Sequence, residues 1–269
     1  MTLDLDLGSC DAKIARAREH LHSLQRETRA HVAAQEATHA VRFSPVDPET
    51  GWCEITLIPQ DIKEPRLSAI LGDVIHNLRC ALDYAITTLV EAHNVTLTTS
   101  HQFPIFTDAA FYASRVGTKT TANPDGPLKG ITEGLTVVED WQPYHTKPDP
   151  RTDALWGVHR FSNADKHRQP AIEGLVPVGR LDLAFNGYKV EEDIIEEIAE
   201  WSPDQEIPVG RIRFDPPRAE NLRAVGKVNL DVRFVTPEWR DDPRLTMPLR
   251  ALPFVVERVS QIVDSFRYL

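Results

Sequence analysis

The chain has 269 residues, of which 41% are hydrophobic and 26% are charged, a balance typical of a globular protein with a real core. Its 40 acidic residues outnumber its 30 basic ones, and the formal net charge is −10. Such a surface repels phosphate, so broad nonspecific coating of DNA is disfavoured, although a local basic cleft remains compatible with RNA binding.

The sequence also indicates where in the cell the protein is located and whether it binds a cofactor. No apolar run approaches the roughly 20 residues that span a bilayer, and the acidic N-terminal segment lacks the basic start of a secretory signal. The three cysteines are an odd number without metal-binding spacing, which favours reduced thiols. We therefore predict a cytoplasmic protein with no membrane partner, no cofactor and no bound metal.

The predicted elements follow from the period of the apolar residues. In chain order the sequence predicts long helices over 10–37 and 65–93 with a β-hairpin over 40–58 between them, followed by short helices near 107–116 and 130–141 and a helix over 152–168. After these it predicts antiparallel strands within 175–235, interrupted by a short acidic helix over 191–201, and a closing helix over 249–267. This order predicts an α+β fold. We expect a single domain over 1–269, with a helical core over 1–170 and 249–269 and a strand-rich part over 171–248.

A first polar motif lies on the predicted helix 65–93 and reads G-D-V-I-H-N-L-R-C-A-L-D-Y from Gly72. At about 100° per residue, its polar side chains fall on one arc opposite an apolar face, and that arc holds Asp73, His76, Asn77, Cys80 and Tyr84, flanked by Arg79 and Asp83. One interpretation is a network that locks the helix in register. The other is a site in which His76 moves protons, Arg79 holds an anion, and Asp73 or Asp83 orients them.

A second polar motif lies on the predicted helix 152–168 and reads L-W-G-V-H-R-F-S-N-A-D-K-H-R from Leu155. His159, Asn163, Lys166 and His167 fall on one side of that helix. Lys166 also suits the negative end of the helix dipole, a purely structural role. If the two motifs face each other across a helix pair, their histidines, arginine and lysine share one cleft.

The two motifs together resemble a group of uncharacterised bacterial proteins that share G-D-x2-H-N-L-R-x2-L-D-[aromatic] and N-x-D-K-H-R, and this group is loosely similar to the HEPN superfamily. That resemblance implies a helical bundle, a homodimer, and RNA binding or metal-independent endoribonuclease activity in a defence or stress system with a cognate antitoxin or defence partner. The superfamily signature is an arginine, a short spacer and a histidine. Arg79 matches the arginine, whereas Tyr84 stands at the histidine position, and Arg160 with His167 gives a second match.

The resemblance also implies roles for the motif residues. RNA would be cleaved by its 2′-hydroxyl, with His76 or His167 moving protons and Arg79 or Lys166 stabilising the charged phosphorane. The remaining motif residues would bind the RNA, and they are Asp73, Asn77, Asp83, Tyr84, His159 and Asn163. Two other classes stay open. One is a non-enzymatic interaction protein, which Tyr84 favours, and the other is a metal-dependent hydrolase with Asp and His ligands.

Overall fold

The computed structural model describes most of the helical part of the chain and the paired parts of its strands. The described residues are 3–34, 41–58, 64–167, 171–177, 182–185, 189–195, 206–215, 224–227, 230–235 and 246–269. The chain divides into two compact units. Unit 1 comprises residues 1–24, 65–171 and 236–269, and unit 2 comprises residues 25–64 and 172–235. This division does not test the prediction of a single domain over 1–269, which stays a prediction.

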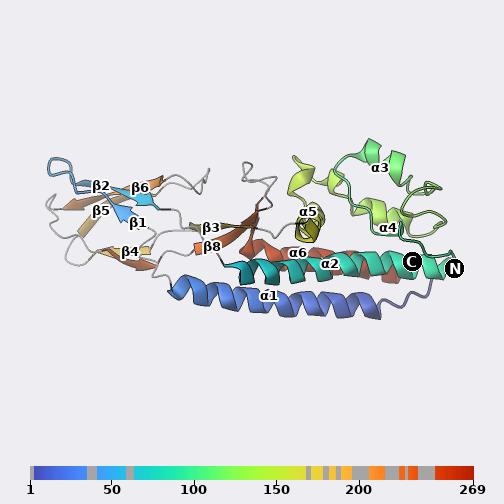
Figure 1. Cartoon of the computed structure of the whole chain (residues 1–269). Helices are drawn as coiled ribbons and strands as arrows, with labels where there is room; N and C mark the ends of the chain where they lie inside the picture. The colour runs from blue at the N-terminus through green and yellow to red at the C-terminus, as the bar shows by residue number, and fades with distance from the viewer. Residues whose placement is uncertain are drawn as a thin grey trace. The chain divides into compact units, whose positions relative to one another are not determined.

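Helices dominate the described part of unit 1 (Figure 1). The α-helices are α1 (Gly8–Ala34, of which residues 8–24 belong to unit 1), α2 (Pro65–Ala92), α3 (Ala109–Arg115), α4 (Leu135–Asp140), α5 (Ala154–His167) and α6 (Leu252–Ser265). Short 3-10 helices lie at η2 (Pro143–His145), η3 (Pro150–Thr152), η6 (Leu249–Ala251) and η7 (Phe266–Tyr268), and β9 (Met247–Pro248) is a two-residue strand. Each predicted helix outside the strand region is found, with ends shifted by a few residues. Within the described ranges, no helix combines the length and the apolar character needed to cross a bilayer.

Helix α2 is the centre of the unit 1 core. The apolar side predicted from its period is buried, because Val74, Leu78, Ala81, Leu82 and Leu89 are all 0% exposed. Burying a leucine or valine side chain stabilises the fold by roughly 1.5–3 kcal/mol, so this face contributes to the stability of the unit at several positions. Helix α1 buries one stripe of apolar residues spaced three or four apart, at Ile14, Ala17, Leu21 and Leu24.

Unit 2 consists mainly of antiparallel strands. Its four-stranded sheet has the order β1 (Val41–Phe43), β2 (Trp52–Leu57), β6 (Ile207–Asp215) and β5 (Lys189–Ile195), and further pairs join β3 (Ala171–Pro177) to β8 (Leu230–Val235) and β4 (Asp182–Phe185) to β7 (Ala224–Lys227). The pairing of β1 with β2 confirms the predicted hairpin. Helical and strand-rich parts together confirm the α+β class.

The acidic segment 191–201 differs from its prediction. Residues 191–195 lie in strand β5 and not in a helix, and residues 196–201 lie outside the described part. The reason is pairing with β6, in which Glu192 faces Arg213 and Ile194 faces Arg211. A β-branched residue and backbone pairing with a neighbouring strand both favour a strand, and periodicity within eleven residues does not reveal such a partner strand.

The three cysteines differ in accessibility, which gives a first test of the fold. Cys10 and Cys53 are 0% exposed, and Cys80 is half-buried. Burial raises the pKa of Cys10 to about 11 and raises that of Cys53 as well, so both thiols stay protonated and unreactive at pH 8.

We expect Ellman's reagent to modify one thiol quickly in the native protein and three in urea. A Cys80→Ser variant should lose the fast phase, and three fast thiols in the native protein would contradict the structure.

Candidate functional site

The candidate site is a cavity in unit 1 between α2, α5 and the loop 102–108. Its volume is about 410 Å³, within the range of roughly 300–1,000 Å³ that small-molecule sites span. Its walls combine aromatic rings with polar side chains, among them Arg79, Phe103, Phe106, Trp156, His159 and Asn163. The cavity therefore joins Arg79 of the first polar motif with four residues of the second, which are Trp156, His159, Ser162 and Asn163.

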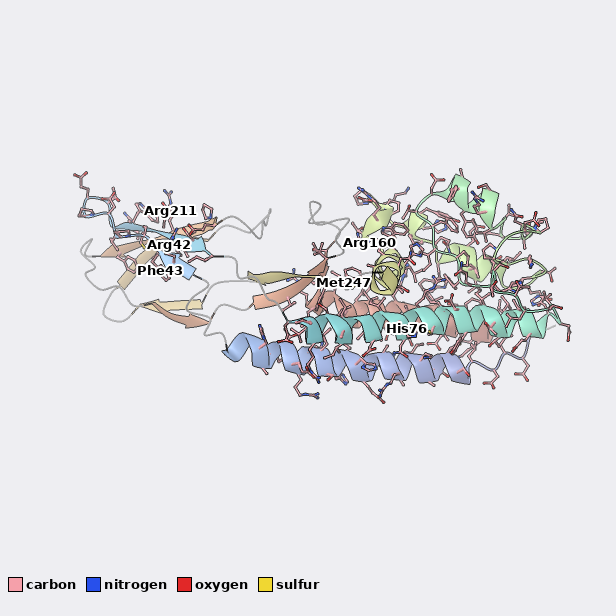
Figure 2. The ribbon with its side chains drawn as sticks, viewed as in Figure 1. Arg42, Phe43, His76, Arg160, Arg211 and Met247 are labelled. Atoms are coloured by element: carbon pink, nitrogen blue, oxygen red, sulfur yellow. The ribbon has the colours of Figure 1, made fainter. Side chains whose placement is uncertain are left out.

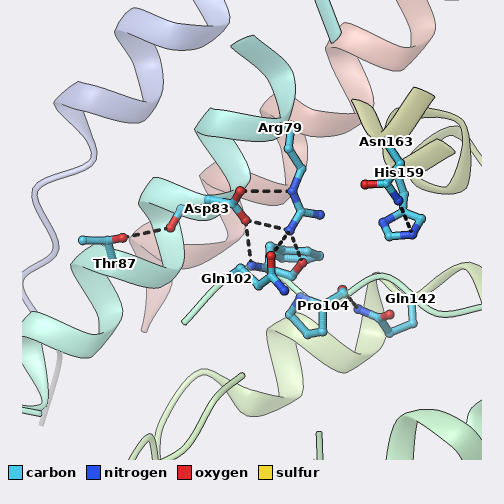
Figure 3. A network of polar contacts seen from close by, with 9 residues as sticks. Arg79, Asp83, Thr87, Gln102, Pro104, Gln142, His159 and Asn163 are labelled. Atoms are coloured by element: carbon cyan, nitrogen blue, oxygen red, sulfur yellow. Dashed lines mark hydrogen bonds and ion pairs between the residues drawn. The ribbon is translucent and has the colours of Figure 1, made fainter. Parts of the chain in front are cut away.

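Arg79 and Asp83 form an ion pair one helical turn apart on α2 (Figure 3). Arg79 Nη2 lies 2.8 Å from Asp83 Oδ1, and Arg79 Nε donates to Asp83 Oδ2 at 3.0 Å. The same two side chains hold the cavity loop, because Arg79 Nη2 donates to the Phe103 carbonyl at 2.8 Å and the Phe103 N–H donates to Asp83 Oδ1 at 2.9 Å. This pair fixes the position of the loop that forms one wall.

Gln142, which follows α4, holds the same loop from the other side. It is 1% exposed, accepts a hydrogen bond from the Phe106 N–H at 3.0 Å, and donates to the carbonyls of Pro104 and Val138 at 2.8 and 2.9 Å. Sequence reasoning missed Gln142, since a single glutamine in the segment W-Q-P-Y carries no periodic signal. Its role depends entirely on which backbone groups come to lie beside it.

Aromatic contacts brace the wall next to this loop. The Phe106 ring meets the edges of Phe111 and Tyr112, with ring centroids 5.5 and 5.9 Å apart, and Tyr112 contacts Tyr144 at 5.7 Å. Burial raises the pKa of Tyr112 above its usual value, so its phenol stays neutral. The wall is therefore apolar and uncharged at this point.

Helix α5 supplies the opposite wall. The rings of Trp156 and His159 stack with centroids 5.1 Å apart and planes 21° apart, and Asn163 Nδ2 lies 3.1 Å from His159 Nε2. The predicted spacing of His159 and Asn163 by four residues thus brings their side chains into contact. Trp156, one turn before His159 on the same helix, is also part of the cavity wall.

Two buried N–H groups of this cavity lack an acceptor. Arg79 Nη1 and Trp156 Nε1 are both covered, and neither has a hydrogen-bond partner among the described residues. Figure 3 shows the Arg79 guanidinium between Asp83 on one side and His159 with Asn163 on the other. Leaving such a donor unsatisfied costs about 1–3 kcal/mol, so an acceptor supplied by a ligand would be favourable here.

The rest of the first motif does not line this cavity. His76 and Asp73 are exposed, as Figure 2 shows for His76, and His76 Nε2 lies 3.5 Å from Cys80 Sγ. Asn77 and Tyr84 contact Lys13 of α1, whose Nζ lies 3.3 Å from Asn77 Oδ1 and 5.9 Å from the Tyr84 ring centroid. These polar residues therefore belong to the α1–α2 contact and the surface beside it.

The end of the second motif is described only in part. Helix α5 runs to His167, but the side chains of Lys166 and His167 lie outside the described residues. Arg160 is buried and lines a different, smaller cavity of about 180 Å³ together with Met247 (Figure 2). Among the described side chains, no three His, Cys, Asp or Glu residues come together in a group that could hold a metal ion.

Comparisons with known proteins add no relative to this picture. No protein-family model, no curated protein and no solved structure matches the chain significantly. The residues that line the cavity are therefore the main indication of function.

Proposed function

We propose that the protein binds single-stranded RNA and that the cavity between α2 and α5 receives one unpaired base. One observation carries this proposal. A single cavity of about 410 Å³ combines aromatic walls with two residues, Arg79 and Trp156, that each have an N–H group without a hydrogen-bond acceptor among the described residues. Proteins recognise single-stranded RNA by stacking splayed bases on aromatic or arginine side chains and by hydrogen bonding to their edges.

The charges of the cavity favour a base over a phosphate. The carboxylate of Asp83 neutralises the guanidinium of Arg79, and Asp108 adds a negative charge to the lining. The chain as a whole carries a net charge of −10. Phosphate contacts make affinity strongly dependent on salt, so binding through a base predicts an affinity that changes little between low and physiological salt.

Fluorescence anisotropy with a labelled single-stranded RNA and its duplex form tests this proposal. We expect the single strand to bind more tightly than the duplex, and Trp156→Leu to weaken binding by about tenfold, because stacking on an aromatic side chain contributes roughly 1–3 kcal/mol per base. The exposed His22 on α1 provides a control, and His22→Ala should bind like the wild type. Equal affinity for the duplex, or an unchanged affinity of a folded Trp156→Leu variant, would refute the proposal.

Metal-independent RNA cleavage is a second candidate, because His159 and Arg79 line the same cavity. In that reaction the 2′-hydroxyl attacks the adjacent phosphorus and the 5′-oxygen leaves, so that one group accepts a proton and another returns one. His159 is the described histidine that lines the cavity and could do either, and Lys166 and His167 keep the roles that the HEPN resemblance implies.

Incubation of RNA with the protein in chelator separates cleavage from binding. Cleavage that His159→Ala removes and His76→Ala leaves intact would support a reaction in the cavity. Loss with His76→Ala alone would place the reaction on the surface beside α1 and contradict this site. Binding without any cleavage would leave the protein as an RNA-binding, non-enzymatic one.

The homodimer and a cognate antitoxin or defence partner belong to the same proposal, because they come from the HEPN resemblance, and the cytoplasmic location stays a prediction drawn from the three cysteines. Light scattering of the purified protein measures the first. Co-purification with the product of a neighbouring gene tests the second.

A further inference from the structure

We infer that Cys80 is a modification site, at which the thiol forms a mixed disulfide with a low-molecular-weight disulfide of the glutathione class. Cys80 does not line the cavity between α2 and α5, and the inference does not rest on the proposed function. It depends on the imidazole of His76, which contacts the thiol, and on the ammonium group of Lys13 on the neighbouring helix α1.

Cys80 and His76 form a nucleophile–base pair one helical turn apart on α2. His76 Nε2 lies 3.5 Å from Cys80 Sγ, within hydrogen-bond reach of a sulfur atom. His76 is exposed (Figure 2) and Cys80 is half-buried, so a small reagent from solvent can reach the pair. An imidazole in this position can accept the thiol proton, and the thiolate that results is the nucleophilic form of cysteine.

A second basic group lies on the same side of α2. The Nζ atom of Lys13 lies 3.3 Å from Asn77 Oδ1 and 5.9 Å from the centroid of the Tyr84 ring. Asn77 and Tyr84 stand three residues before and four residues after Cys80, so all three share one side of the helix. The ammonium group therefore lies beside the part of α2 that carries the thiol, where a positive charge stabilises a thiolate.

Two carboxylates on the same helix oppose a thiolate less strongly than these two basic groups favour it. Asp73 lies two turns before Cys80, and its Oδ2 atom is 3.8 Å from Nδ1 of His20 on α1. Asp83 forms the ion pair with Arg79 described above. Each carboxylate thus has a partner of its own, whereas the imidazole of His76 is in contact with the thiol.

The reaction is a thiol–disulfide exchange. The Cys80 thiolate attacks one sulfur of the small disulfide, a new S–S bond forms to Cys80, and the S–S bond of the reagent breaks. The departing half leaves as a thiolate and takes up a proton, which the imidazolium of His76 can return. Cys80 is thereby oxidised and the small disulfide is reduced, so the exchange needs no further oxidant.

The rate of modification by oxidised glutathione, measured against pH, tests this inference. A synthetic peptide of residues 77–84 is the reference, because it carries the same cysteine without His76 or α1. At about pH 7 we expect the native protein to react at least about threefold faster, because its larger thiolate fraction outweighs the lower nucleophilicity of a stabilised thiolate. At about pH 9.5 both thiols are ionised, and this advantage should disappear or reverse.

Three variants of the whole protein assign the effect to the groups beside the thiol. His76→Gln keeps the thiol accessible but removes the base, so its rate relative to the peptide should not change with pH. Lys13→Gln should weaken the pH dependence without abolishing it. His22→Gln changes an exposed histidine of α1 and is the matched control, which should react like the wild type. Peptide mass spectrometry should place the added glutathione on Cys80.

The outcomes separate a nucleophile–base pair from simple accessibility. A protein-to-peptide rate ratio that falls with rising pH in the wild type, and stays constant in His76→Gln, supports the inference. Steric access alone gives a ratio that does not change with pH, so a constant ratio in the wild type overturns it. An unchanged pH dependence in His76→Gln, or modification at Cys10 or Cys53 in place of Cys80, overturns it as well.

Discussion

Replacing Asp83 by alanine is expected to destabilise the protein by about 3 kcal/mol. The Arg79 side chain is only 11% exposed, and without Asp83 its charge would be buried with no counterion, which costs roughly 3–5 kcal/mol. The Phe103 N–H would also lose its acceptor. Because the Asp83 side chain is 31% exposed, water can replace part of what is lost, which places the expected effect at the lower end. Urea unfolding followed by circular dichroism measures it.

Two further variants make this first prediction specific. Glu91 is an exposed carboxylate on the same helix, so Glu91→Ala should change the free energy of unfolding by less than about 0.5 kcal/mol. The double variant Arg79→Ala/Asp83→Ala should be less destabilised than Asp83→Ala alone, because no unpaired charge remains buried. If Asp83→Ala proves as stable as the wild type, the ion pair does not hold the loop.

Replacing Gln142 by alanine should have a comparable effect, about 3 kcal/mol or more. The change removes one acceptor and two donations, and it leaves the Phe106 N–H and the carbonyls of Pro104 and Val138 buried without this partner. Each buried group left unsatisfied costs about 1–3 kcal/mol. Hydrogen exchange should locate the damage, because exchange at the Phe106 amide should become faster while exchange at the amides of α2 changes little.

Gln142→Glu separates hydrogen bonding from packing in this second prediction. The substitution keeps the size and the acceptor for Phe106, but it directs a carboxylate at two carbonyl oxygens, so we expect it to be at least as destabilising as Gln142→Ala. The exposed Gln102, which lines the same cavity, is the control, and Gln102→Ala should change stability by less than about 0.5 kcal/mol. A stable Gln142→Glu variant would mean that packing alone holds the loop.

The two predictions also bear on the cavity, because Asp83 and Gln142 hold the same loop from opposite sides. A variant that folds at low temperature but has lost either contact should bind the proposed base more weakly, through a looser wall. We therefore expect stability and binding to fall together in these variants.

The sequence alone determined the elements whose cause is local. The period of apolar residues predicted α1, α2, α5 and α6, and it identified the buried side of α2. It also placed His159 and Asn163 on one side of their helix, and these two side chains are in contact, because residues four apart lie on the same side of a helix.

Only the tertiary structure decided what depends on a distant partner. Residues 191–195 form a strand because β6 pairs with them, and Gln142 matters because the backbone of 104–106 lies against it. The polar arc of α2 was predicted as one unit, yet its residues separate, with Asn77 against α1, His76 on the surface, and Arg79 in the cavity. Helical periodicity gives the direction of each side chain around its own axis, whereas the element that packs in that direction is chosen by contacts between residues far apart in the chain.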